Sequence, residues 1–238
     1  MRHFKSLLNT DAEPSFRFID PPFNFNSSTV SKYGTEATGF HVLNSLCRRM
    51  GWTSLAGRKL LDFGCGVRFT RTIVNLGLDI GLYAGVDVNA DAIQWLRSNI
   101  QDDRFRFERI DMKNQMYNPQ GSTIDIATLK DMGLVNFDAA CMYSVITHQT
   151  PEDTKTILLM LSHCVVPKGG LYFTAFFDDT IDEYAERDPD NTCRVCTYNP
   201  NYLINLAEES GWVVRKIYPA SAVHQSTFVC HKRLRDMV

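Results

Sequence analysis

The chain has 238 residues, of which 44% are hydrophobic and 22% are charged, and its formal net charge is -2. This length fits one α/β domain with a substantial core and an additional arm, because two complete domains would be cramped. The small net charge argues against a nucleic-acid partner, and the sequence contains no apolar run long enough to span a membrane.

The first residues are expected to form an arm. Residues 1–30 alternate phenylalanines with prolines, so they cannot build a core of their own and either pack over the main domain or help to close a pocket. Residues 35–50 then place apolar side chains at positions 40, 43, 46, 47 and 50 on one face of a helix, which Gly51 ends. We expect residues 1–58 to form an N-terminal arm and helix that cover a ligand site, and residues 59–238 to form the main α/β core.

A buried strand that ends in a glycine turn follows. Asp62 lies inside an apolar run, and the turn is formed by Gly64, Cys65 and Gly66. Glycines suit this position because the backbone must pass through positive φ and approach a ligand closely. A helix that begins beyond the turn would direct its first N–H groups toward a carboxylate or phosphate. The turn lacks the third glycine of a dinucleotide signature, because Phe69 occupies that position.

Two more apolar runs end in acidic residues. The run over residues 82–88 contains Asp87 and ends at Val88. Asp87 lies about 20 residues beyond the turn, where a carboxylate can bind ribose hydroxyls. The next run is followed by Asp111 and Met112. Three strand-then-acid units in register argue against a chance pattern.

The rest of the chain alternates predicted helices and strands. We expect helices over residues 70–76, 90–100, 126–132, 151–165 and 200–210, and strands over residues 137–143, 171–177, 213–218 and 226–231. The connection between the last two strands is too short for a helical crossover, so these strands should pair antiparallel. The fold class is therefore α/β, with a Rossmann-like, doubly wound, seven-stranded sheet that is mostly parallel and has an antiparallel last strand. The polar stretch over about residues 178–199 is expected to be an insertion over the site.

The motifs LLDFGCG, GVDV and RIDM resemble the successive cofactor-binding motifs of class I S-adenosylmethionine-dependent methyltransferases of the bacterial small-molecule type. The resemblance covers residues 59–177 well and includes PKGG before an apolar strand. The family usually has a third small residue after the turn, where this sequence has Val67 and Arg68. The resemblance implies S-adenosylmethionine as the cofactor. The implied cofactor-binding residues are Tyr33, Gly34, Asp62, Gly64, Cys65, Gly66, Asp87, Val88, Asp111, Met112, Tyr143 and Ser144.

The resemblance also assigns roles to the acidic residues. Asp87 would bind the ribose hydroxyls, while Asp111 and Met112 would flank the adenine. The simpler alternative is that these carboxylates cap helices or lie in solvated loops. Strand-end residues carry most weight because ligands of a doubly wound sheet bind outside the carboxyl ends of its strands.

Two residues that follow later strands are candidate catalytic bases. His148 follows the fourth predicted strand, where acceptors approach in the family, and a histidine titrates near neutral pH. Asp178, with Asp179 beside it, follows the fifth predicted strand and is its rival. A histidine at this place can also serve only to brace a loop, and a base is needed only when the acceptor must lose a proton.

The expected function is transfer of a methyl group from S-adenosylmethionine to an oxygen or nitrogen of a small-molecule acceptor. The alternatives are a Rossmann-type NAD(P)-dependent oxidoreductase and a non-catalytic subunit that keeps the cofactor pocket. A homodimer is left open. Cys193 and Cys196 form a C-x-x-C without a second pair, so we expect no metal. The seven cysteines lack framework spacing and residues 1–30 lack a signal-peptide core, which indicates the cytoplasm.

Overall fold

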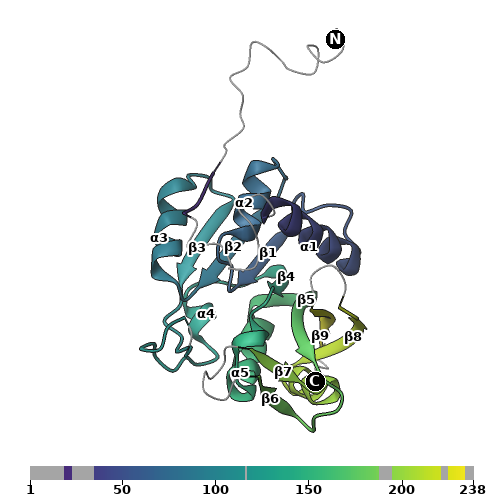
Figure 1. The fold of residues 1–238 in the computed structure, drawn as a ribbon. Coiled ribbons are helices and arrows are strands. Elements are labelled where there is room, and N and C mark those ends of the chain that lie inside the picture. The colour runs from purple at the N-terminus through teal and green to yellow at the C-terminus, as the bar shows by residue number, and fades with distance from the viewer. Residues whose placement is uncertain (1–18, 23–34, 116, 188–194, 221–224, 234–238) are drawn as a thin grey trace, which may run out of the picture.

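The structure is a computed structural model that describes residues 19–22, 35–115, 117–187, 195–220 and 225–233. Tyr33, Gly34 and Cys193, which the sequence singled out, lie outside the described residues, as do most residues of the arm. The described chain alternates strands with helices (Figure 1). The helices are α1 (Thr35–Met50), α2 (Arg68–Asn75), α3 (Ala90–Asn99), α4 (Thr128–Asp131), α5 (Pro151–Cys164) and α6 (Pro200–Glu209), with the 3-10 helix η3 (Ile146–His148). The strands are β1 (Lys59–Phe63), β2 (Leu82–Asp87), β3 (Phe105–Arg109), β4 (Phe137–Met142), β5 (Val165–Phe177), β6 (Tyr184–Glu186), β7 (Cys196–Tyr198), β8 (Trp212–Tyr218) and β9 (Ser226–Lys232).

The sheet has the order β3-β2-β1-β4-β5, and these five strands pair in parallel. β9 pairs antiparallel with β5, and β8 pairs antiparallel with β9. The predicted doubly wound, mostly parallel sheet with seven strands is therefore confirmed. Two short strands are added to it within the stretch read as an insertion. β7 pairs with the last residues of β5, and β6 forms an antiparallel hairpin with β7.

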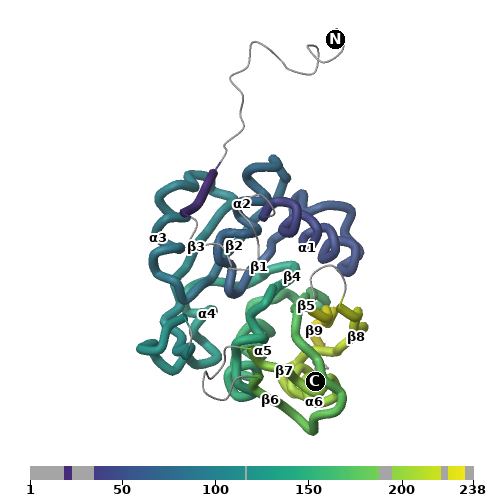
Figure 2. Tube along the Cα trace, in the orientation of Figure 1, coloured from purple at the N-terminus to yellow at the C-terminus, as the bar shows by residue number. Residues whose placement is uncertain are grey.

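The sheet separates two hydrophobic cores, because successive residues of a strand face opposite sides. In β1, Leu60 belongs to the core beneath α1, α2 and α3, and Leu61 belongs to the core beneath α4, α5 and α6. Figure 2 shows that the first half of the chain forms one side of the molecule and the second half the other. β1 and β4 meet between the halves, where the strand order reverses. This is the point at which sheets of this kind bind ligands.

Local sequence signals set the helix starts. Asn89 accepts the N–H of Ala92 over 3.1 Å at the start of α3, and Thr150 accepts the N–H of Asp153 over 3.2 Å at the start of α5. Asn199 accepts two backbone N–H groups in the first turn of α6. These side chains satisfy backbone donors that have no partner within a helix.

Two details of the sequence interpretation are wrong. Phe40 was assigned to the buried face of α1, yet its side chain is 47% exposed. Gly39 makes the close contact instead, since a Cβ there would lie 2.0 Å from Thr72 Oγ1 of α2. β5 begins at Val165 and not at residue 171, because a shift in its pairing with β4 keeps the intervening turn in the strand, with Lys168 at φ 66°.

The described part of the arm lies against α2. The Asn75 side chain accepts the N–H of Ile19 over 2.8 Å and donates to its carbonyl over 3.0 Å. Arg71, which is buried, pairs with Asp20 over 3.3 Å and also with Glu36 of α1. Asn75 and Arg71 of α2 therefore hold Ile19 and Asp20 in place, and both side chains also bind Glu36 of α1.

Candidate functional site

The glycine turn lies directly beyond β1. Gly64 and Gly66 both have positive φ, 75° and 46°, and the N–H groups of Gly64 and Cys65 donate to the carbonyl of Val86 on β2. A Cβ on Gly64 would lie 2.4 Å from a methyl carbon of Val145, so no larger residue fits there. A Cβ on Gly66 would meet no atom within 4 Å. The space beside Gly66 is therefore open to a ligand.

Asp87 at the end of β2 is joined to this turn. One carboxylate oxygen accepts the N–H of Gly66 over 2.8 Å, and the other accepts the N–H of Asn89 over 2.9 Å. Burial raises the pKa of Asp87, and the backbone N–H groups around it partly offset this. A carboxylate has about four lone-pair sites, so both oxygens keep the capacity to accept from a ligand. The next residue, Val88, is half-buried.

Asp62 lies in the interior, below the turn. Its carboxylate accepts a hydrogen bond from the Tyr83 hydroxyl over 2.5 Å and from the Cys141 thiol over 3.3 Å, and the residue is 1% exposed. Burial raises the pKa of Asp62 to about 7. Asp62 thus joins β1 to a side chain of each neighbouring strand, Tyr83 of β2 and Cys141 of β4.

The start of α2 contacts both α1 and the end of β4. Arg68 donates to the Thr38 hydroxyl over 2.8 Å, and its guanidinium lies 5.0 Å from the centre of the Tyr143 ring. The rings of Phe69 and Tyr143 are 6.1 Å apart. Tyr143 therefore lies beside the first residues of α2, shortly after the glycine turn. Arg68 had been noted only as a departure from the family motif.

Asp111 and Met112 face opposite environments, since Asp111 is exposed to solvent and Met112 is buried. Asp111 is exposed and accepts hydrogen bonds from Asn118, Ser122 and Arg109, and the first two lower its pKa most. Met112 is 3% exposed and packs into the core. Asp111 thus organises the loop beyond β3, and its contact with the adenine stays a prediction.

His148 lies in η3, close to the same loop. The side-chain amide of Asn114 donates to the His148 carbonyl over 2.9 Å. The Tyr117 ring meets the imidazole edge-on, with 5.5 Å between ring centres. Tyr117 itself is 53% exposed. The sequence did not single out Asn114 or Tyr117, because nothing local marks a loop residue as the neighbour of one more than 30 positions away.

The rival base, Asp178, caps a turn. Its carboxylate accepts the N–H of Thr180 over 2.9 Å and the Thr180 hydroxyl over 2.6 Å. These hydrogen bonds lower the pKa of Asp178. A carboxylate with a lowered pKa is a weaker proton acceptor at neutral pH.

Ser144, beyond β4, belongs to a polar cluster. Its backbone has φ 60°, which is uncommon for a residue other than glycine. Its N–H donates to Thr174 Oγ1 over 2.9 Å, and the side-chain amide of Gln225 donates to its hydroxyl oxygen over 2.9 Å. Thr174 and Gln225 were missed by the sequence interpretation.

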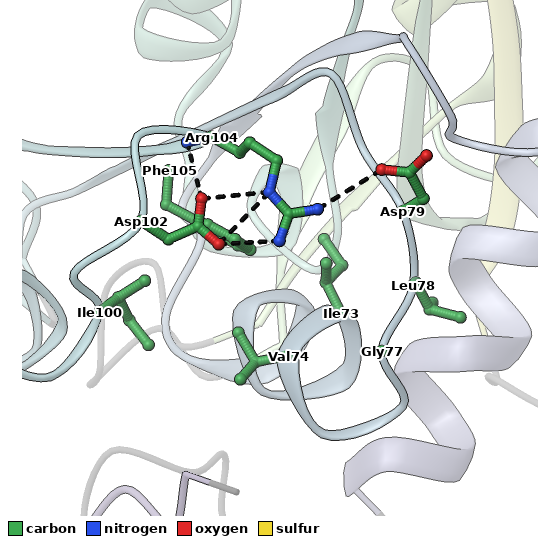
Figure 3. Close-up of a pocket in the computed structure, with 9 residues that line it drawn as sticks. All are labelled: Ile73, Val74, Gly77, Leu78, Asp79, Ile100, Asp102, Arg104 and Phe105. Atoms are coloured by element: carbon green, nitrogen blue, oxygen red, sulfur yellow. Dashed lines mark hydrogen bonds and ion pairs between the residues drawn. The ribbon is translucent and has the colours of Figure 1, made fainter. Parts of the chain in front are cut away.

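A surface pocket of about 340 Å³ lies at the other end of the sheet (Figure 3). Its residues belong to the end of α2 and to the segments before β2 and β3. They are Ile73, Val74, Gly77, Leu78, Asp79, Ile100, Asp102, Arg104 and Phe105. The Arg104 guanidinium is held by Asp102 over 2.8 Å and by Asp79 over 3.4 Å. None of the predicted site residues lines this pocket.

Two further properties bear on the candidate classes. Among the described residues, no group of three or more His, Cys, Asp or Glu side chains could hold a metal ion. In the same part of the chain, no helix combines the length and apolar character needed to cross a membrane.

Comparison with known proteins gives the family. A family model described as a methyltransferase domain matches residues 36–217, more than half of the chain. Magnesium protoporphyrin IX methyltransferase from Synechocystis PCC 6803, solved with bound S-adenosylmethionine, is 14% identical with a TM-score of 0.53, over 87% of each chain. An amino pentose methyltransferase from Micromonospora echinaspora is 11% identical with a TM-score of 0.57, over 87% of this chain and 99% of that one.

A third solved structure is the 1,6-didemethyltoxoflavin-N1-methyltransferase of Burkholderia thailandensis, which is 15% identical with a TM-score of 0.55, over 84% of this chain and 79% of that one. At these identities the likeness is one of fold. The fold and the family match agree with the motifs at the ends of β1, β2 and β3. The chain belongs to the methyltransferase-domain family and has the class I methyltransferase fold.

Proposed function

We propose that this enzyme transfers a methyl group from S-adenosylmethionine to an oxygen or nitrogen atom of a small-molecule acceptor. The observation that carries the proposal is the hydrogen bond from Gly66 N–H to Asp87. It joins the glycine turn after β1 to the acidic end of β2, and β1 is one of the two strands between which the strand order reverses. The Synechocystis enzyme binds S-adenosylmethionine, and the acceptors named for the three compared enzymes are small molecules. Family membership favours methyl transfer over the oxidoreductase alternative.

The residues around the glycine turn fit this cofactor. The open space beside Gly66 admits a ligand close to the backbone, and the remaining lone pairs of Asp87 suit two ribose hydroxyls. Tyr143 offers a ring at the neighbouring strand end, and Asp62 acts indirectly, by supporting β1. The residues that we propose to bind the cofactor are Gly64, Cys65, Gly66, Asp87, Val88, Asp111, Met112, Tyr143 and Ser144, together with Tyr33 and Gly34 outside the described residues, while Asp62 is proposed to contribute only through β1.

The protein's contribution to catalysis is positioning. The cofactor supplies the methyl group as part of a sulfonium, and transfer is in line to the acceptor atom. Orienting the two reactants can supply much of the acceleration of such a step. When the acceptor atom carries a proton, we propose that His148 removes it. Asp178 is the weaker candidate, because its hydrogen bonds to Thr180 lower its pKa.

The acceptor side of the site is proposed to lie between η3 and the β6–β7 hairpin. β7 of this hairpin lies beside the last residues of β5 and pairs Thr197 with Phe176 and Tyr198 with Phe177. The Tyr198 hydroxyl donates to the Gln149 carbonyl over 2.7 Å, which joins β7 to the end of η3. A reducing, cytoplasmic location fits the six described cysteines, which are all buried free thiols.

The test combines binding with turnover. Calorimetry should show binding of S-adenosylmethionine and of its demethylated product, and no binding of NAD. Incubation with methyl-labelled cofactor and a small-molecule extract should then give one labelled product, whose mass spectrum shows the methylated atom. Cofactor binding without a labelled product from any extract would identify a non-catalytic subunit. NAD binding without cofactor binding would refute the whole assignment.

A further inference from the structure

We infer that Gln225 is a positioning residue, which sets the orientation of His148 through a ring of hydrogen bonds at Ser144. This inference rests on the proposed function, since it takes His148 as the base on the acceptor side. Gln225 lies directly before β9 and is 81 positions from Ser144 along the chain. It is 8% exposed.

Three hydrogen bonds close the ring. The backbone N–H of Ser144 donates to Thr174 Oγ1 over 2.9 Å, and the Thr174 hydroxyl donates to Gln225 Oε1 over 2.5 Å. Gln225 Nε2 donates to Ser144 Oγ over 2.9 Å. The ring therefore joins the end of β4, the middle of β5 and the start of β9.

The ring requires an amide at position 225. The side chain accepts at one end from Thr174 and donates at the other end to Ser144. An ionised carboxylate of the same shape can accept but cannot donate, and an alkyl group can do neither. Thr174 is fully buried, so a lost partner there is not readily replaced by water. Gln225 thus stabilises the left-handed backbone of Ser144 by binding both the Ser144 hydroxyl and Thr174, the acceptor of the Ser144 N–H.

A further contact connects this ring of hydrogen bonds to η3. Ser144 Oγ also lies 3.3 Å from Thr147 Oγ1. Either hydroxyl can be the donor in this contact, and Thr147 is 1% exposed, so few other partners are within its reach. Thr147 precedes His148 within η3, whose His148 N–H donates to the Val145 carbonyl over 2.9 Å. The hydrogen bonds that link Gln225, Ser144 and Thr147 therefore reach the short helix that carries the imidazole.

The test uses the imidazole signals of His148 in nuclear magnetic resonance, because these do not depend on knowing the acceptor. They are assigned by their loss in His148→Gln. In Gln225→Glu, the new carboxylate cannot donate to Ser144 Oγ, so the hydroxyl groups of Ser144 and Thr147 must rearrange, and we expect displaced His148 signals and a changed titration midpoint. Gln94→Glu, the same change on an exposed position of α3, should leave both as in the unaltered protein.

Three further readouts separate positioning from folding. Gln225→Glu should keep the affinity for S-adenosylmethionine within about twofold, and should lower turnover tenfold or more without a matching rise in KM for the acceptor. Ser144→Gly keeps the backbone conformation without strain and removes the hydroxyl, so it should displace the His148 signals even if Gln225→Glu folds poorly. Unchanged His148 signals in Ser144→Gly or in a folded Gln225→Glu would overturn the inference. Failure of the unaltered protein to bind S-adenosylmethionine would instead refute the proposed function.

Discussion

The N–H of Gly66 donates to the carboxylate of Asp87 over 2.8 Å, and this bond joins the turn after β1 to the end of β2. It depends on two separate features of the sequence. Glycine adopts the φ of 46° at residue 66 without strain, and an acid ends the neighbouring parallel strand. The two features lie 21 positions apart and meet because parallel strands end at the same edge of a sheet.

Asp87→Ala should weaken binding of S-adenosylmethionine by about 1.5 to 3 kcal/mol, the scale for lost hydrogen bonds to a charged group. The loss arises from the ribose hydroxyls and from the released Gly66 N–H. Calorimetry with the cofactor and its demethylated product measures it. Asp91→Asn, on the exposed start of α3, is the matched control and should bind normally. Equal affinity in Asp87→Ala and the control would show that the ribose is bound elsewhere.

Two glycine substitutions should separate folding from binding. Gly64→Ala combines a positive φ with a clash against Val145, and should lower the free energy of unfolding by about 2 to 4 kcal/mol. Gly66→Ala carries only the backbone cost of about 1 to 2 kcal/mol, because its methyl group enters open space. That space is where the cofactor is proposed to lie.

Thermal unfolding and calorimetry on both variants test this contrast. In Gly66→Ala, the loss of binding free energy for the cofactor should exceed the loss of unfolding free energy. In Gly64→Ala, the loss of unfolding free energy should be the larger of the two. A Gly66→Ala protein that binds the cofactor normally would mean that the ligand does not approach the turn.

Stability should depend on pH through Asp62. Burial raises the pKa of this carboxyl from 3.8 to about 7, so between these values the folded state holds a proton that the unfolded state has released. The contribution of Asp62 to the free energy of unfolding is therefore greatest below pH 4 and is lost as the pH rises to 7. At about 1.4 kcal/mol per pKa unit, the change is on the order of 4 kcal/mol.

Urea unfolding of the unaltered protein and of Asp62→Asn, at pH values from 4.5 to 8, isolates this effect. Asn still accepts from Tyr83 but does not titrate, so the difference between the two curves should shrink or reverse toward high pH. A difference that stays constant over this range would show that Asp62 does not change its protonation state between pH 4.5 and 8.

His148→Gln should lower turnover by about 10² to 10⁴, the usual loss for a general base, and should change cofactor affinity little. Asp178→Asn is the informative comparison, because Thr180 already engages its carboxylate, and it should cost only a few-fold. Both are measured once the labelled product identifies an acceptor. Near-normal turnover in His148→Gln, together with a lower melting temperature, would make His148 a structural residue of η3.

Local chemistry was sufficient for most of the fold. The caps Asn89, Thr150 and Asn199, and the positive φ of Gly64 and Gly66, follow from what these side chains can do within a few residues. Phe40 was misplaced because the face that α1 buries is decided by its packing on α2 through Gly39, not by its own periodicity. The early start of β5 likewise depends on its pairing with β4.

The residues of the candidate site likewise fall into those that the local sequence marks and those that only the packing of distant segments brings together. Residues at strand ends could be found because a motif marks each of them. Gln225 and Thr174 could not, since they act on Ser144 from 81 and 30 positions away and no local pattern records such a contact. Arg68 was visible in the motif, but its contacts with Thr38 and Tyr143 depend on how α1 crosses the sheet.

β9 is the last strand of the described chain, yet it lies between β5 and β8. During synthesis, every predicted strand-end residue up to Ser144 emerges before β9, at about 5 to 20 residues per second. Until residues 226–232 have been made, β5 presents an unpaired edge over Gly170 to Ala175, and β8 has no strand to join in this part of the sheet. Unpaired edges of this kind recruit other chains. A nascent or C-terminally shortened chain should therefore aggregate through β5 and β8, even though it already contains the whole cofactor side of the site.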